Sequence, residues 1–276
     1  MIVQLKLNTM KKLLLILLCV PLIGFGQENY ISNEYFQEES YQYLIADDVN
    51  IRLGPSTKTS IVANLPIGSR LKIIEELTSR YTYNNISFPW YKVSFILDKR
   101  EKIGYVVGGF IAQEYHIEDY TSNHPLYQDI IFLSGISKYY SDGKIKYQIR
   151  VAKENKEIDK IEYYPIEVPF DDSRFYVFRN EDISNGIYII KTNFYQASCA
   201  IQKNETTFFF DRNNLYHIKS FSNMDYKTLG FENGRIQINK LIWVDNPENE
   251  LNGGDYGKKE MIEEYIWDGR RLKRFY

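Results

Sequence analysis

Cysteine and histidine are scarce in this 276-residue chain, which holds two Cys and three His. Once the apolar N-terminal segment is set aside, only Cys199 remains, so no disulfide can form within the chain and stability must come from core burial. Zinc needs several closely spaced ligands, and no His-x-x-x-His pair occurs. Cys199 lies in a strand-like segment 18 residues before His217, and we interpret it as a small buried residue rather than a nucleophile.

Signatures of catalytic sites are missing as well. No Gly-x-Ser-x-Gly motif marks a serine hydrolase. Asp171-Asp172 follows Pro169-Phe170 and is interpreted as the start of a turn, although a glycosidase carboxylate pair stays open. The acidic segment at residues 246–257 lacks EF-hand spacing, which favours a solvated loop over a calcium site. We therefore predict no catalytic residue, no metal and no cofactor.

Long apolar runs are confined to the N-terminus. Residues 13–25 form an apolar run that follows Lys11-Lys12 and is too short to favour a membrane span. Gly24 and Gly26 place small residues where a signal peptidase would need them. The pattern predicts a signal peptide and an exported protein, periplasmic or secreted, without an integral membrane span after cleavage.

Three alternatives at the N-terminus stay open. The apolar run could remain as an uncleaved anchor, and translation could start at Met10, which opens a compact signal sequence. Cys19 is interpreted as an ordinary signal-core residue rather than a lipidation site, because Leu18 precedes it and an apolar segment follows.

Charge of either sign is not in strong excess. The first 26 residues hold three Lys and no acid, so 34 less 3 leaves 31 basic against 36 acidic residues. A net charge near −5 argues against nucleic acid or anionic lipid as the main partner. Aromatic residues are abundant, with 24 Tyr and 16 Phe. Tyr at this density suits half-buried strands and also suits the binding of carbohydrate or peptide.

Four short motifs follow one another between residues 50 and 106. They are Asn50-Ile51-Arg52-Leu53-Gly54-Pro55, Leu65-Pro66-Ile67-Gly68, Trp90-Tyr91-Lys92-Val93 and Gly104-Tyr105-Val106. In this order they resemble the bacterial SH3-like (SH3b) family, with Tyr105 at the place of the usual Trp. The resemblance covers about a quarter of the chain. It implies a small barrel and a non-catalytic domain that binds cell-wall peptides.

The ligand-binding candidates in this segment are one cation and four tyrosines. They are Arg52, Tyr81, Tyr83, Tyr91 and Tyr105. Arg52 can pair with a carboxylate of a peptide stem, and the Tyr rings offer flat surfaces for stacking. Alternatively, Arg52 pins a loop while Trp90 and Tyr105 belong to the core. Residues 81–89, predicted as a long loop or ribbon, include Tyr81 and Tyr83, and we expect them to make most ligand contacts.

Residues 125–276 show repeated Asx-Gly turns between alternating runs. The turns are Asp142-Gly143, Asn185-Gly186, Asn233-Gly234 and Asp268-Gly269. Such turns suit tight hairpins, and they predict an antiparallel meander of about eight to eleven strands. Residues 258–265 are predicted as a further strand, with a short helix as the alternative.

The chain is thus predicted to be all-β, with a small SH3-like barrel followed by an antiparallel β-meander sandwich or barrel. The expected segments are a signal peptide (1–26), a leader (27–42), an SH3b-like domain (43–115) and a β-rich domain of unknown function (125–276). The expected function is non-catalytic binding at the cell envelope, with peptidoglycan or an envelope protein as partner. Two alternatives remain: an envelope hydrolase with its active site in residues 125–276, and a structural or interaction protein.

Overall fold

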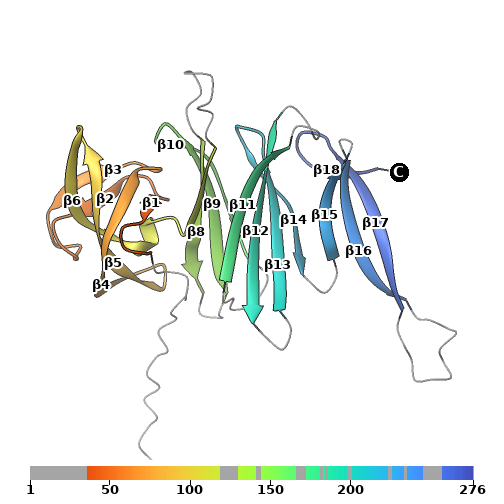
Figure 1. The fold of residues 1–276 in the computed structure, drawn as a ribbon, viewed down its shortest axis with the longest axis horizontal. Coiled ribbons are helices and arrows are strands. Elements are labelled where there is room, and N and C mark those ends of the chain that lie inside the picture. The colour runs from red at the N-terminus through yellow and green to blue at the C-terminus, as the bar shows by residue number, and fades with distance from the viewer. Residues whose placement is uncertain are drawn as a thin grey trace, which may run out of the picture. The chain divides into compact units, whose positions relative to one another are not determined.

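The structure, a computed structural model, describes most of the chain after residue 35 (Figure 1). The described residues are 36–118, 130–140, 144–165, 172–180, 183, 186–197, 201–222, 226–232, 235–244 and 257–275. By its internal contacts the chain divides into Met1–Tyr30 and Ile31–Tyr276, and all described residues belong to the second unit. The predicted signal peptide, Cys199, Asp171 and the predicted loop 246–257, except its last residue, lie outside the described residues.

The predicted all-β class is confirmed, because the regular elements of the described residues are strands apart from one short 3₁₀ turn. The elements are β1 (Tyr41–Tyr43), β2 (Val49–Arg52), β3 (Ile61–Leu65), β4 (Arg70–Tyr83), β5 (Ile86–Leu97), β6 (Arg100–Val107), η1 (Gly108–Phe110), β7 (Glu114–Glu118), β8 (Ile130–Tyr139), β9 (Ile145–Lys153), β10 (Lys156–Tyr163), β11 (Asp172–Asn180), β12 (Ile187–Ala197), β13 (Ile201–Phe210), β14 (Leu215–Ser222), β15 (Tyr226–Glu232), β16 (Arg235–Val244), β17 (Gly257–Trp267) and β18 (Leu272–Arg274). The segment at 258–265 is therefore a strand, as predicted.

The first six strands form one antiparallel sheet, in the order β1-β4-β5-β6-β2-β3, which curls into a half-barrel (Figure 1). Alternate residues of β5, namely Tyr91, Val93 and Phe95, face its inner core. Phe36 is buried in the same core, with its ring 5.2 Å from the ring of Tyr91. The half-barrel therefore includes residues of the predicted leader, earlier than residue 43.

The segment predicted as a long loop or ribbon is a ribbon. Strands β4 and β5 continue to Tyr83 and from Ile86, so only Asn84 and Asn85 form the turn between them. Both residues have positive φ, 51° and 64°. Asn tolerates this left-handed conformation, and two such residues match the twist of a tight hairpin.

The next two sheets pack face to face as a sandwich. Their strand orders are β10-β9-β8-β7 and β11-β12-β13-β14. The ring of Phe132 on β8 lies 5.2 Å from that of Tyr188 and 5.6 Å from that of Phe210, both on the second sheet. Strand β7 lies beside β11, and β10 lies beside β14. At the second of these seams the Leu215 N–H donates to Asp159 Oδ2 over 2.7 Å.

The sheet β11-β12-β13-β14 has apolar cores on both faces. Tyr188 and Ile190 point into the core shared with β8 and β9, whereas Ile189 between them points into a second core. On β13, Phe208 and Phe210 face the first core, and Phe209 faces the second. A strand buried on both faces needs apolar side chains at successive positions, which explains the continuous runs 187–190 and 208–210.

The last sheet covers the second of these faces. Its order is β15-β16-β17-β18, and Ile236 and Ile238 of β16 are buried against the preceding sheet. The ring of Trp267 on β17 lies 5.1 Å from that of Phe209. The β17–β18 turn begins at Asp268, as predicted. Backbone N–H groups of Arg271 and Arg270 donate to its carboxylate and lower the pKa of Asp268 to about 2.

The half-barrel and the sandwich are joined by shared apolar clusters across the predicted domain boundary. Ile86, Phe88 and Trp90 of β5 belong to the same buried cluster as Phe132 of β8. A second cluster joins Tyr43, Ile45 and Ile67 of the half-barrel to Leu133 and Ala152. Ile86, Phe88 and Trp90 lie on the outer face of the half-barrel, and these contacts bury side chains that would otherwise face solvent.

We expect truncation of Phe209 to weaken the stack of sheets. Phe209→Ala should lower the free energy of unfolding by about 3–5 kcal/mol, the usual cost of removing a fully buried Phe side chain. Tyr176→Ala, at a position on β11 with 42% of the residue exposed, should change it by less than about 1 kcal/mol. Equilibrium urea unfolding measures both. Equal effects of the two substitutions would contradict the packing described for β13.

Glu114 lies at the seam between β7 and β11. Its Oε1 accepts a 2.8 Å hydrogen bond from Ser173 Oγ on β11. Burial raises the pKa of Glu114 above its ordinary value, although the bonds from Ser173 and from the Phe175 backbone oppose this. The carboxylate of Glu114 therefore binds its proton more tightly in the folded protein than in the unfolded chain.

This seam predicts a pH-dependent stability. A raised pKa in the folded state means that the contribution of Glu114 is complete below the unfolded pKa, near 4.5, and is lost as pH rises through the folded value. Glu114→Gln keeps the acceptor and removes the charge, so it should be more stable than the wild type at pH 7 and equal to it below about pH 4. Urea unfolding across this range checks the result, with exposed Glu38→Gln as control. A loss of stability at pH 7 would contradict it.

Candidate functional site

Arg52 pins the loop that follows β2. Its Nη1 donates a 2.7 Å hydrogen bond to the carbonyl of Thr59. The hydroxyl of Thr59 in turn donates to the carbonyls of Gly54 and Ser56, at 2.9 and 2.8 Å. The loop-pinning interpretation of Arg52 is therefore what the structure shows. The guanidinium has five N–H donors, so this bond alone does not exhaust its capacity.

Tyr91 is a core residue. It is 0% exposed, and its hydroxyl donates to Glu76 Oε2 over 3.0 Å. The prediction that its ring offers a stacking surface is wrong, because β5 turns this side chain into the half-barrel core. Trp90, on the other face of β5, is 3% exposed, so its interpretation as a core residue is confirmed.

Tyr81 and Tyr105 are half-buried beside Trp90. Both pack against the cluster that the half-barrel shares with the sandwich. The ring of Tyr81 meets that of Trp90 edge to face, at 6.3 Å and 63°. Tyr105 lies opposite Arg52 on β2 and opposite Lys92 on β5. Each ring thus covers the core with part of its surface and presents the remainder to solvent.

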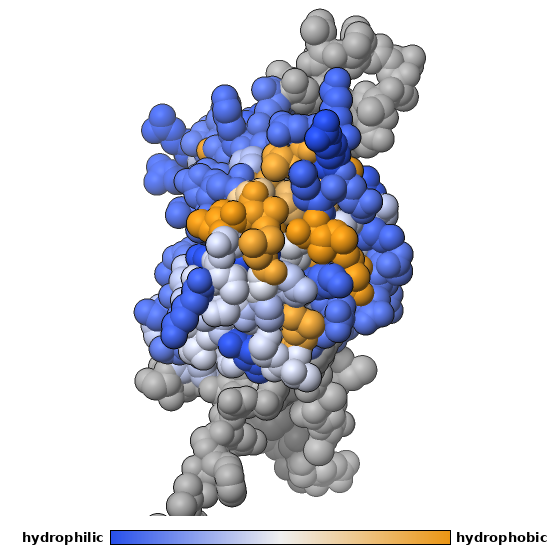
Figure 2. Space-filling model, turned by 90° about the vertical axis from the view of Figure 1, so that its left-hand side faces the viewer, coloured by the Kyte–Doolittle hydropathy of each residue, from blue (hydrophilic) through white to orange (hydrophobic). Residues whose placement is uncertain are grey.

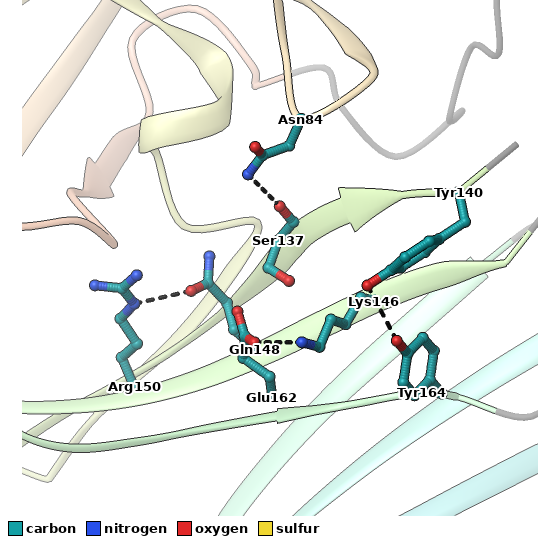
Figure 3. Close-up of polar contacts among 8 residues, drawn as sticks. All are labelled: Asn84, Ser137, Tyr140, Lys146, Gln148, Arg150, Glu162 and Tyr164. Carbon is teal, nitrogen blue, oxygen red and sulfur yellow. Dashed lines mark hydrogen bonds and ion pairs between the residues drawn. The ribbon is translucent and has the colours of Figure 1, made fainter.

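Tyr83 is more open, at 43% exposed, but the tip of its ribbon is docked on β8. Figure 3 shows the side chain of Asn84 reaching Ser137, whose carbonyl accepts its 2.8 Å hydrogen bond. The amide of Asn85 donates to the carbonyl of Tyr139 over 3.3 Å, and the Tyr139 N–H donates back to the carbonyl of Asn84 over 3.2 Å. The tip expected to contact a ligand therefore fastens the half-barrel to the sandwich.

A polar and aromatic cluster lies next to this docking point. Tyr164 donates to the hydroxyl of Tyr140 over 3.1 Å, and Figure 3 shows the two phenols meeting. Lys138 Nζ lies 4.8 Å from the centre of the Tyr140 ring. Lys146 Nζ contacts Glu162 at 2.5 Å, a hydrogen bond that raises the pKa of Lys146 and lowers the pKa of Glu162. The polar groups of this cluster therefore largely bond to one another.

The outer face of the half-barrel carries its open positions. Strand pairing sets Lys72 opposite Tyr41 on β1 and opposite Ser94 on β5, and Ser94 opposite Ile103 on β6. Residues directly opposite in neighbouring strands share a face of the sheet. Trp90 lies on the same face of β5 as Ser94, at the end that the sandwich covers. Ser94 is itself 6% exposed, and Ile96, two residues further along β5, is 68% exposed, so this face is buried at one end and open at the other.

A groove of about 470 Å³ lies on this open end. Its walls include Tyr41, Arg70, Lys72, Ser94, Ile96 and Glu101, and the β9–β10 turn contributes Asn155. The volume falls within the range of about 300–1,000 Å³ that is common for small-molecule sites. The groove combines an exposed aromatic ring, an exposed aliphatic side chain and charges of both signs.

The two cations of the groove are held differently. The guanidinium carbon of Arg70 lies 3.7 Å from the centre of the Tyr41 ring, a stacked cation–π arrangement. Lys72 Nζ contacts Glu39 Oε2 at 2.5 Å, and this hydrogen bond raises the pKa of Lys72 above its ordinary value. Within the part of the chain that the structure describes, Arg70 has no carboxylate within 4 Å. Arg70 is therefore the cation that is free to receive an anion.

The half-barrel also carries exposed apolar side chains, one of which, Ile96, lies in the wall of the groove. Figure 2 shows apolar side chains gathered in the middle of one face, with hydrophilic ones around them. Four apolar residues of the half-barrel are more than half exposed: Leu53, Ile61, Ile96 and Ile103. Of these, Ile61 lies opposite Arg52, and Ile103 lies two residues before Tyr105. Apolar side chains gathered on a protein surface are typical of an interaction site.

The residues of the groove are not among the binding residues predicted from the sequence. Arg70 and Lys72 alternate with buried Leu71 and Ile73, and this period of two would have placed both cations on the outer face. Tyr41 was assigned to the leader, because nothing in its neighbourhood shows the alternation of a long strand. The meeting of β1, β4 and β5 depends on sheet order, which no local pattern reports.

Within the described ranges, no group of three or more His, Cys, Asp or Glu residues is arranged to hold a metal ion. Asp172 lies 3.6 Å from Arg174 at the start of β11. His116 contacts Glu118, and His217 bonds Ser220. Among the same residues, no helix has the length and apolar character required to cross a membrane.

Comparisons with models of protein families, with curated proteins and with solved structures give no significant match to this chain.

The ribbon tip gives a test of how firmly the half-barrel is fastened. Asn85→Ala keeps a β-carbon at a φ of 64° but loses the short polar side chain that lets Asn tolerate this conformation, and it removes the bond to Tyr139. The free energy of unfolding should therefore fall by about 1–2 kcal/mol. Asn85→Gly loses the same bond without backbone strain and should stay within about 0.5 kcal/mol of wild type. Urea unfolding distinguishes the two. If the Gly variant is as destabilised as the Ala variant, the turn geometry is not what holds the tip.

Proposed function

We propose that this chain is an exported, non-catalytic binding protein of the cell envelope. Its half-barrel, which resembles the SH3b family in its motifs, binds a peptide of peptidoglycan in the groove formed by β1, β4 and β5. The observation that carries the proposal is the guanidinium of Arg70, stacked on Tyr41 at the wall of an open groove without a carboxylate partner in the described residues.

The chemistry of this arrangement suits a carboxylate. Guanidinium presents N–H donors in a planar fork that matches the two oxygens of a carboxylate, and stacking on Tyr41 fixes the plane of the fork. Stem peptides of cell walls end in carboxylates and carry small apolar side chains. Ile96, which is 68% exposed, supplies an apolar contact beside Arg70.

The residues predicted from sequence extend the same face. Arg52 and Tyr105 lie opposite each other in neighbouring strands, and Ile103 leads from Tyr105 toward the groove. In the proposal, these residues contact a longer ligand that leaves the groove along β6. Tyr81 and Tyr83 form a separate candidate contact on the β4–β5 ribbon. An envelope protein that covers the exposed apolar residues is the second candidate partner, favoured by Leu53, Ile61 and Ile96.

Co-sedimentation with insoluble peptidoglycan tests the proposal. Arg70→Gln should weaken binding about ten- to a hundredfold, because a hydrogen bond to a charged group contributes about 1.5–3 kcal/mol. Arg100→Gln removes an exposed cation of the neighbouring hairpin and should leave binding unchanged. Point substitutions are preferable to deletion of residues 43–115, because deletion would uncover the core around Phe132.

The same assay separates the two candidate sites. If Tyr83→Ala removes sedimentation and Arg70→Gln does not, the ribbon and not the groove is the contact. If the wild-type protein does not sediment at all, the peptidoglycan assignment fails, and a protein partner on the exposed apolar face takes its place.

A further inference from the structure

The groove holds one acid as well as its cations, and this acid is not neutralised locally. Glu101 lies on β6, and within the described ranges no Lys or Arg approaches its carboxylate within 4 Å. Lys72 acts on Glu101 through space, but its ammonium is engaged by Glu39. The groove therefore presents one positive group, Arg70, and one negative group, Glu101, each without an ion-pair partner.

Strand register fixes the spacing of the backbones that carry these two groups. Ile96 on β5 pairs with Glu101 on β6. Lys72 on β4 pairs with Ser94, so continuing this register by two residues brings Arg70 level with Ile96. Arg70, Ile96 and Glu101 thus form a row across three adjacent strands. Neighbouring strands are about 4.8 Å apart, which separates the backbones of the two charged residues by about 10 Å.

We infer that the groove selects a short zwitterionic peptide segment, with its carboxylate on Arg70 and its ammonium on Glu101. The inference rests on the proposed function in taking this groove as the binding site, and it adds the charge pattern of the ligand. An extended tripeptide spans about 10 Å, because each residue adds up to about 3.3–3.6 Å. Small apolar side chains at its centre would lie over Ile96, which is 68% exposed.

The pairing also gives the groove a way to reject other ligands. A peptide with both ends blocked leaves Arg70 and Glu101 facing uncharged groups and gains no electrostatic complementarity. A dianionic ligand meets Glu101 as a like charge. Selection therefore depends on two opposite charges at a fixed spacing rather than on affinity for any carboxylate.

Titration of the full-length protein with model tripeptides tests this inference. Tri-alanine with free ends is compared with N-acetyl-tri-alanine and with tri-alanine amide, and binding is followed by backbone amide shifts in NMR spectra. Each blocked end should weaken binding to the wild type about tenfold. Glu101→Gln should weaken binding of the free peptide. N-acetylation should no longer change the affinity for this variant, whereas C-terminal amidation should still lower it. Arg70→Gln should show the reverse pattern.

Glu38→Gln, an exposed acid outside the groove, is the matched control and should behave as wild type. The inference is overturned if acetylated and free peptides bind equally, if Glu101→Gln does not abolish the effect of acetylation, or if none of the tripeptides binds. The peptidoglycan assay is run in parallel. Sedimentation without tripeptide selectivity leaves the proposed function standing and refutes the inference. Selective tripeptide binding without sedimentation refutes the peptidoglycan assignment and leaves the charge pattern intact.

Discussion

Burial of the sheet β11-β12-β13-β14 on both faces is the constraint on which the rest of the structure depends. Tyr188 and Phe208 point to one core, and Ile189 and Phe209 point to the other. A strand with this pattern has no solvent face, so a sheet must cover it on each side. The sheet β10-β9-β8-β7 covers one face, and the C-terminal sheet covers the other. The described residues contain no disulfide, and their fold is stabilised by these stacked apolar layers.

The same principle positions the candidate site. The outer face of the half-barrel is buried where β5 carries Phe88 and Trp90, because these side chains join the core of the sandwich. Beyond Trp90 the same face is left open, and it carries the groove with Arg70 and Ile96. The partly covered sheet thus presents its charged and apolar side chains in the register that strand pairing sets, an arrangement that suits the proposed recognition of a short ligand.

Local patterns predicted the elements better than their arrangement. Period-two alternation and Asx-Gly turns predicted the strands, and the structure has eleven of them between Ile130 and Arg274 within its described residues, the upper end of the expected range. The assignment of Tyr91 as a ligand contact failed for a specific reason: the motif gives residue types, and the face to which each points follows from the register of β5 with its neighbours.

The groove was not predictable because it belongs to no single segment. Tyr41 and Arg70 are 29 residues apart in the chain and stack only because β1 pairs with β4. The length and the Tyr content of the β4–β5 ribbon predicted a ligand contact, yet the tip of the ribbon bonds to Ser137 and Tyr139, residues more than 50 positions away. Long-range pairing of this kind leaves no trace in local composition.

The most direct measurement is an NMR map of the amides that shift when soluble peptidoglycan fragments are added to the labelled protein. The account predicts shifts at Arg70, Ile96 and Glu101 that saturate together, with little change at Asn84 and Asn85. Shifts centred on the β4–β5 ribbon, or no saturable shift in the half-barrel, would contradict it.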